Sequence, residues 1–189
     1  MTSISPLKLT LARGAGALSR RAGRGGGTSL PGKLLLKLQD DAIERLAERL
    51  DKGTIVISAT NGKTTTASLL ASILRCDGIT PVHNHAGANM PGGVASALLA
   101  ATGRGRPTGD IGLFEVDEAW TARLIHELKP AVVVLGNLFR DQLDRYGELE
   151  TLADGWAEMI AALPPRTAVV LNADDPLLAQ LPGDRANVT

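Results

Sequence analysis

Apolar runs and amphipathic stretches alternate along residues 40–189. A short β-branched run predicts a buried strand at residues 54–59, and further apolar runs predict strands at residues 111–116, 131–137 and 167–172, with a weaker strand signal at residues 80–83. Apolar residues at helical spacing predict helices at residues 40–50, 64–74, 94–101, 118–128 and 152–163, with Asp40 as the first N-cap and a short helical start near Pro176. Strands that alternate with helices require right-handed crossovers. The pattern therefore predicts an α/β fold with a mostly parallel sheet flanked by helices.

The first 39 residues differ from the rest in charge. They contain seven Lys and Arg residues and no Asp or Glu, so they carry +7, while residues 40–189 carry −7. We therefore divide the chain into a basic N-terminal segment, residues 1–39, and a central domain, residues 40–189. One helical face of the segment would hold Leu7, Leu11, Ala15 and Leu18, which suits a membrane surface or a phosphorylated substrate. Its many glycines favour a solvated arm instead, and both interpretations stay open.

Composition limits the compartment and the partners. No apolar stretch approaches the ~20 residues of a membrane helix, and the N-terminus lacks a signal-peptide pattern. We expect a cytoplasmic protein, at most in peripheral contact with the inner face of the membrane, and no nucleic-acid partner. A single cysteine, Cys76, excludes an internal disulfide and is expected as a small core residue. His83 and His85 lack a third metal ligand nearby and are expected in an exposed loop.

The segment "ATNGKTTT", residues 59–66, stands between a predicted strand and a predicted helix. Gly62 leaves room for a phosphate, Lys63 can reach terminal phosphates, and the Thr64 hydroxyl can ligate Mg²⁺. The match to the full phosphate-loop pattern is partial, because Ile57 occupies the position of its first glycine. A phosphate-binding loop is therefore the prediction, and an ordinary strand-to-helix turn is the alternative.

Carboxylates follow the third predicted strand in "EVDEA", residues 115–119. Mg²⁺ takes few protein oxygens and completes its shell with water and phosphate, so one carboxylate suffices. Glu115 closes an apolar strand and is our candidate for the metal. Asp117 is expected as a helix N-cap, and Glu118 as a first-turn residue that complements the helix dipole.

Further polar clusters follow the remaining strands: "NHAGANMPGG" at 84–93, "NLFRDQLDRYGELE" at 137–150 and "LNADDP" at 171–176. The second of these clusters is peculiar for a loop because it gathers many charged and amide side chains, and a salt-bridged turn is the alternative that would explain some of its charges. In the third, Asp174 or Asp175 is expected as an N-cap before Pro176. Ligands of parallel α/β sheets gather beyond the carboxyl ends of the strands. The sequence therefore predicts one site drawn from five loops.

In this order and spacing, the segments resemble the ATP-binding central domain of the Mur ligase superfamily, of which the chain would be the N-terminal part. Two departures stand out. Ala59 replaces a glycine that is usual in the family, and no lysine follows Lys129 where the ligases carry one that is carbamylated. These departures argue against an amino-acid-adding ligase or a folylpolyglutamate synthase. They fit the branch formed by the synthetase subunits of lipid II isoglutaminyl synthase, which work with a glutaminase subunit, GatD.

This resemblance implies ATP-dependent amidation of the D-glutamate α-carboxylate of lipid II, with ATP and Mg²⁺ as cofactors. Lys63 would hold the β and γ phosphates, and Thr64 and Glu115 would ligate Mg²⁺. Asn84 and Asn89 are candidates for contact with the substrate or the transferred phosphate. The nucleotide-binding residues would be Thr60, Asn61, Gly62, Lys63, Thr64, Thr65, Asn172 and Asp175.

Relatives of this kind continue beyond the "LNADDP" strand, often with a four-cysteine zinc ribbon for which this chain has no ligand set. The chain is therefore expected to be truncated at its C-terminus, and to bind nucleotide with little amidation on its own. Two alternatives stay open: an amino-acid-adding Mur-type or folylpolyglutamate synthase-like ligase, and a phosphate-loop module without ligase activity.

Overall fold

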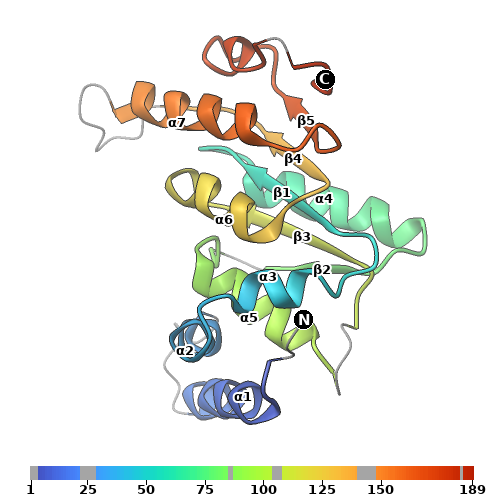
Figure 1. Ribbon diagram of the computed structural model, residues 1–189. Coiled ribbons are helices and arrows are strands. Elements are labelled where there is room, and N and C mark those ends of the chain that lie inside the picture. The colour runs from blue at the N-terminus through green and yellow to red at the C-terminus, as the bar shows by residue number, and fades with distance from the viewer. Residues whose placement is uncertain (1–3, 22–28, 85–86, 104–107, 140–147, 184) are drawn as a thin grey trace.

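The computed structural model describes residues 4–21, 29–84, 87–103, 108–139, 148–183 and 185–189. Within these residues the strands are β1 (Thr54–Ser58), β2 (Pro81–His83), β3 (Ile111–Val116), β4 (Val132–Leu135) and β5 (Ala168–Leu171). They form one parallel sheet in the order β2-β3-β1-β4-β5 (Figure 1). The predicted α/β fold is confirmed. Because β3 and β2 lie on one side of β1 and β4 and β5 lie on the other, the strand order reverses at β1. The loop after β1 therefore lies where such sheets bind ligands.

The described helices are α1 (Pro6–Arg21), α2 (Leu30–Leu38), α3 (Ala42–Ala47), α4 (Lys63–Cys76), α5 (Pro91–Ala101), α6 (Thr121–Leu128) and α7 (Glu148–Ala162), with 3-10 turns η1 (Glu118–Trp120) and η2 (Leu178–Gln180). Those in residues 40–189 lie where helices were predicted, but α5 and α7 begin three and four residues earlier than predicted. The helix α3 is shorter than expected and has Asp41, not Asp40, at its N-cap. The Asp41 carboxylate makes no cap bond because it pairs with Arg45.

Helices cover the two faces of the sheet unequally. On one face α4 packs Ala67 and Ala71 against Ile57 and Leu113. On the other face α3, α5, α6 and α7 share the larger core cluster, with Phe114 near its centre. None of the described helices is long and apolar enough to cross a membrane.

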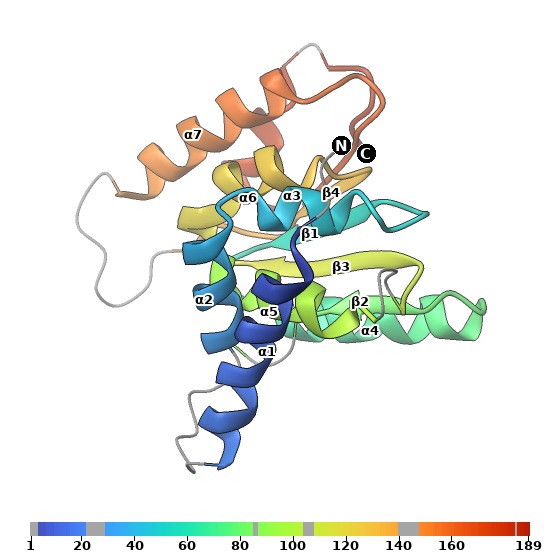
Figure 2. The same cartoon turned by 60° about the horizontal axis from the view of Figure 1, so that its bottom comes forward.

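The N-terminal segment packs on α5 (Figure 2). Leu9, Ala12 and Leu35 belong to the larger core cluster. The Gly32 N–H donates to Ser96 Oγ at 2.8 Å, and a Cβ on Gly32 would lie 2.0 Å from the Gly92 oxygen, so only glycine permits this approach. The solvated-arm interpretation is therefore wrong for the described part of residues 1–39, because packing outweighs the low helix propensity of the glycines.

Two further predictions need correction. Cys76 is exposed rather than in the core, because it ends α4 on the side away from Ala67 and Ala71, the residues that helix buries. His83 is half-buried in the edge strand β2 and does not lie in an exposed loop. His85 lies outside the described residues.

Candidate functional site

The loop after β1 leads directly into the N-terminus of α4. Gly62 has φ +83°, a left-handed conformation in which a side chain would be strained although a Cβ would meet no atom within 4 Å. The first intrahelical bond runs from the Thr66 N–H to the Gly62 oxygen at 2.9 Å, and no side chain caps the helix. The N–H groups of the first turn therefore point to where an anion would bind.

Thr64 and Glu115 meet beside this loop. The Thr64 hydroxyl donates to Glu115 Oε2 at 2.6 Å, and Glu115 is only 1% exposed. Its other oxygen, Oε1, is buried and has no hydrogen-bond partner among the described residues. A buried carboxylate with a spare oxygen, next to a hydroxyl and a phosphate-binding loop, is a donor set that fits Mg²⁺.

Asn84 holds Glu115 in place. It is 2% exposed, and its Nδ2 donates to the backbone oxygens of Ala88 and Glu115 at 2.8 Å each. Its Oδ1 accepts the Glu115 N–H at 3.0 Å. The contacts of Asn84 are thus with the chain itself, which makes it a positioning residue. Asn89 lies nearby, its backbone oxygen accepting the Asp117 N–H at 2.9 Å. A substrate contact for either asparagine stays a prediction.

Lys63 folds back over the loop. Its Nζ lies 3.0 Å from Glu118 Oε2 and 3.3 Å from the Thr60 oxygen, and it also donates to the Ala59 oxygen. Both side chains of the ion pair are largely shielded, at 13% and 16% exposed for Lys63 and Glu118. Sequence reasoning predicted only a dipole role for Glu118, since nothing in a linear pattern shows that β3 lies next to β1. Phosphate binding by Lys63 would replace this carboxylate with another anion.

The residues after β4 hold the other side of the loop. The Asn61 N–H donates to Asn137 Oδ1 at 2.9 Å, and Asn137 Nδ2 donates to the Asn61 oxygen at 3.0 Å. The Phe139 N–H donates to Thr60 Oγ1 at 3.0 Å. A salt-bridged turn does not account for Asn137, because its amide binds the loop backbone. Residues 140–147 of that turn lie outside the described residues.

Two aspartates act as local supports. Asp117 caps η1 by accepting the Ala119 N–H at 3.1 Å, as predicted. Asp175, 6% exposed, accepts the Leu177 N–H at 2.9 Å with Oδ1 and the Leu138 N–H at 2.8 Å with Oδ2. Asp175 thus binds backbone N–H groups at the start of the turn after "DDP", as a cap would, although the N-cap of η2 itself is Leu177.

The remaining predicted nucleotide residues are exposed near the same edge. Asn172 accepts the Asp174 N–H at 3.1 Å with its Oδ1, and Thr65 lies in the first turn of α4. Contact of Asn172, Asp175 or Thr65 with the nucleotide stays a prediction. Within the described residues, no three His, Cys, Asp or Glu side chains are grouped to hold a metal. A cation at Thr64 and Glu115 would therefore take its other ligands from phosphate and water.

The structure therefore defines an α/β domain with a candidate phosphate site, formed by an uncapped helix N-terminus after the central strand and a carboxylate from the adjacent strand. The chain belongs to the Mur ligase family, because residues 57–189 match the Mur ligase middle domain. It is 39% identical over 171 residues to the lipid II isoglutaminyl synthase (glutamine-hydrolyzing) subunit MurT of Staphylococcus aureus strain N315. It is 38% identical over 176 residues to the subunit of the same name of Streptococcus pneumoniae strain R6. Both alignments cover 90% of this chain, which spans 38% of the length of each relative.

Solved structures support the same fold. MurF ligase from Thermotoga maritima, in complex with ADP, superposes with a TM-score of 0.63 at 22% identity, covering 79% of this chain and 35% of that one. MurF from Acinetobacter baumannii gives a TM-score of 0.62 at 18% identity, covering 85% and 34%. At 18% and 22% sequence identity, these structural similarities establish only that the fold is shared.

Proposed function

We propose that this protein is the ATP-dependent synthetase subunit of a lipid II isoglutaminyl synthase. The observation that carries the proposal is the hydrogen bond from the exposed Thr64 hydroxyl to the buried Glu115 carboxylate beside an uncapped helix N-terminus. Identity of 38–39% with subunits named for that reaction supports the choice of substrate. The acceptor would be the α-carboxylate of D-glutamate in lipid II, and the nitrogen would come from glutamine hydrolysed by a GatD glutaminase subunit.

The chemistry needs activation because a carboxylate is a poor electrophile. A carboxylate oxygen of the substrate would attack the γ-phosphorus of ATP, and ADP would leave. Ammonia would then attack the acyl carbon of the resulting acyl phosphate, and phosphate would depart as the nitrogen loses a proton. Such catalysis depends mainly on positioning and on neutralising phosphate charge.

The residues supply these functions separately. The N–H groups of the first turn of α4 would bind phosphate oxygens, and Lys63 would leave Glu118 for the β and γ phosphates. Thr64 and Glu115 would hold Mg²⁺, which would neutralise phosphate charge when bound. Asn84 would hold the backbone of Glu115 in place, so that the carboxylate of Glu115 stays available to the metal. Zinc has no part in this proposal.

An amino-acid-adding ligase is the second candidate. It is favoured by 37% identity over 124 residues, covering 65% of this chain, to the UDP-N-acetylmuramate–L-alanine ligase of Thermobifida fusca. Against it stands the lack of any lysine after Lys129 in this sequence. A phosphate-loop module without ligase activity would bind ATP and release no ADP when substrates are added.

The test reconstitutes the reaction with this chain and with a longer version extended to the length of its relatives. Each is mixed with a GatD-type glutaminase, glutamine, ATP, Mg²⁺ and lipid II, and the product is examined by mass spectrometry beside ADP release. We expect amidated lipid II from the longer protein, little from the present chain, and none from the longer Lys63→Ala variant. ADP release that requires a free amino acid and no glutaminase would overturn the proposal in favour of the second candidate.

A further inference from the structure

Helix α1 carries an apolar stripe on its outer side. Leu7, Leu11 and Leu18 are 67%, 52% and 72% exposed, and their spacing of four and seven residues puts them on one helical face. Leu9 and Ala12, on the opposite side, are 8% and 0% exposed and pack into the core. We call the three exposed leucines the α1 face. Three large apolar side chains in one exposed row mark a surface for a partner.

Specific bonds fix α1 in place. Lys8 Nζ donates to Gln39 Oε1 at 2.8 Å, and Arg13 Nη2 donates to the Leu99 oxygen at 3.4 Å and also to the Thr102 oxygen. These bonds join the helix to the residues after α2 and to the end of α5. The α1 face is therefore presented by an anchored helix, which loses little conformational freedom when it binds.

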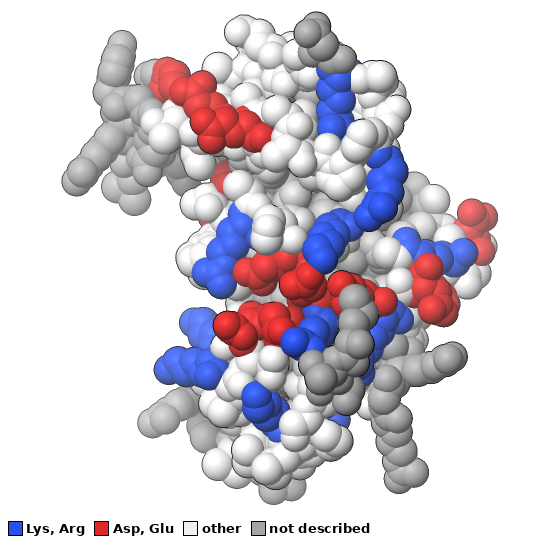
Figure 3. Space-filling view, viewed as in Figure 1, with Lys and Arg blue, Asp and Glu red and all other residues white. Residues whose placement is uncertain are grey.

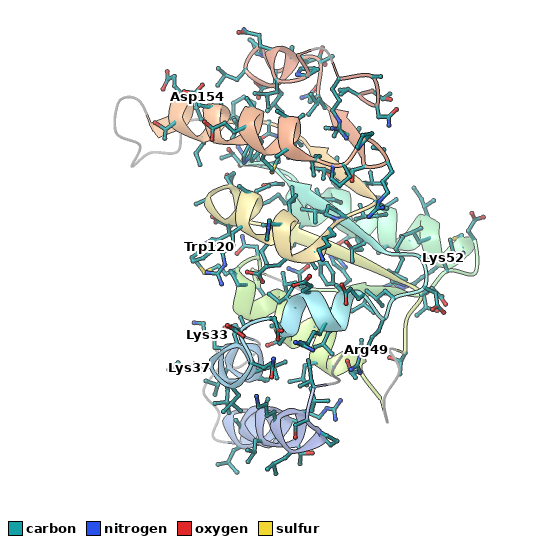
Figure 4. The ribbon with its side chains drawn as sticks, viewed as in Figure 1. Lys33, Lys37, Arg49, Lys52, Trp120 and Asp154 are labelled. Carbon is teal, nitrogen blue, oxygen red and sulfur yellow. The ribbon has the colours of Figure 1, made fainter. Side chains whose placement is uncertain are left out.

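The surroundings of the α1 face are basic. Residues 1–39 hold seven Lys and Arg residues and no acidic residue. Lys33 and Lys37 are exposed and project side by side from α2 (Figure 4). In the view of Figure 3 the lower end of the molecule, over α1, shows Lys and Arg among uncharged residues, and acidic residues lie above it. This end lies opposite α7 and β5 (Figure 1).

We propose that the α1 face binds an anionic lipid bilayer. Leucines would enter the boundary between headgroups and acyl chains, and the lysines would remain among anionic headgroups, as in interfacial amphipathic helices. Leucines at such spacing can also form a helix–helix seam. A second copy would bring two positively charged segments together, so charge favours the anionic bilayer over self-association. The proposal does not depend on the proposed reaction.

The test is co-sedimentation with vesicles of phosphatidylcholine alone or mixed with phosphatidylglycerol. The variant Leu7→Gln/Leu11→Gln is compared with Leu69→Gln/Ile73→Gln, a matched pair on α4 with the same spacing and 62% and 63% exposure. Circular dichroism and nucleotide binding verify that each variant is folded. We expect binding to mixed vesicles that falls about tenfold or more in the first variant and stays unchanged in the second.

Charge is tested separately with Lys33→Gln/Lys37→Gln. We expect weaker binding to mixed vesicles, and wild-type binding that declines as salt is raised. Failure of the wild-type protein to bind either vesicle would overturn the proposal. An equal loss of vesicle binding in Leu7→Gln/Leu11→Gln and in Leu69→Gln/Ile73→Gln would also overturn the proposal. Self-association in sedimentation velocity that Leu7→Gln/Leu11→Gln abolishes, without vesicle binding, would assign the α1 face to a second copy.

Discussion

The two sides of the phosphate loop are built differently. On the β3 side, Asn84, Glu115, Ser58 and Thr121 are each at most 2% exposed and form two hydrogen-bonded pairs: Asn84 with the Glu115 backbone, and Thr121 Oγ1 with Ser58 Oγ at 2.8 Å. On the β4 side, the loop is held by partly exposed bonds, and Phe139 is 55% exposed.

This difference separates a fixed support from an adaptable one. A buried hydrogen bond has no water to replace it, so breaking it leaves an unpaired group at high cost. An exposed bond exchanges readily with water and contributes little net stability. The carboxylate that would hold the metal therefore stands on the rigid side, while the side formed by Asn137 and Phe139 can rearrange around a ligand at low cost.

The largest expected effect is on stability. Asn84→Ala would leave three buried backbone groups without partners and should lower the free energy of unfolding by about 3 kcal/mol. Asn137→Ala removes two exposed bonds and should cost less than about 1 kcal/mol. Urea unfolding followed by circular dichroism measures both. Equal losses in the two variants would remove the distinction between the two sides.

The next effect is on metal-dependent binding. Glu115→Gln keeps the shape of the side chain and can still accept the Thr64 hydroxyl, but it removes the charge. We expect Mg²⁺-ATP affinity to fall about tenfold or more, or about 1.4 kcal/mol, with binding of metal-free ATP unchanged. Glu118→Gln is the matched control and should bind Mg²⁺-ATP at least as well as the wild type, because Lys63 loses its competing carboxylate. Full Mg²⁺-ATP affinity in Glu115→Gln would refute the metal assignment.

A smaller effect tests the turn between loop and helix. Gly62→Ala forces a side chain into a left-handed conformation and should lower stability by about 1 kcal/mol. Gly155→Ala, inside α7 with no atom within 4 Å of the new Cβ, should raise stability by about 0.5–1 kcal/mol. Thermal unfolding of both variants gives the comparison. A stabilising Gly62→Ala would show that the turn does not require this conformation.

The smallest effect lies outside the site. Hydrogen bonds from Arg45 and then Gln39 lower the pKa of Asp41 from 3.8 to about 2. A carboxylate with a lowered folded-state pKa stabilises the fold above its unfolded pKa and loses that contribution as pH falls from about 4 to 2. Because the pair is at the surface, Asp41→Asn should cost less than about 0.5 kcal/mol at neutral pH. The free energies of unfolding of the wild type and the variant are measured at pH 7 and at pH 2. The difference between them should become smaller at pH 2.

Sequence reasoning predicted the elements of residues 40–189 and the central motif, but it did not predict α2. The apolar, β-branched runs located each of the described strands, and "NGKTT" located the loop, because strand, glycine and helix are signalled by neighbouring residues. It selected Glu115 as the metal candidate because a carboxylate that closes an apolar strand is unusual, and the structure places that carboxylate beside Thr64, while metal binding stays a prediction.

It missed relationships that depend on the order of strands in the sheet. Glu118 reaches Lys63 only because β3 lies beside β1, and Asn137 reaches Asn61 only because β4 lies on the other side. Gly32 looked like a helix breaker, but its lack of a side chain lets α2 approach α5. Cys76 looked apolar, but α4 packs on the sheet through few residues and leaves its end exposed. Such features follow from packing between distant segments, which local patterns do not encode.

The most direct test of the central claim is calorimetric titration with Mg²⁺-ATP of the wild-type chain, Lys63→Ala and Lys52→Ala. Lys52 is an exposed lysine before β1 and serves as the matched control (Figure 4). We predict saturable binding by the wild type and Lys52→Ala, and none by Lys63→Ala. Equal binding by Lys63→Ala, or no binding by any of the three proteins and their longer versions, would contradict a nucleotide site at this loop.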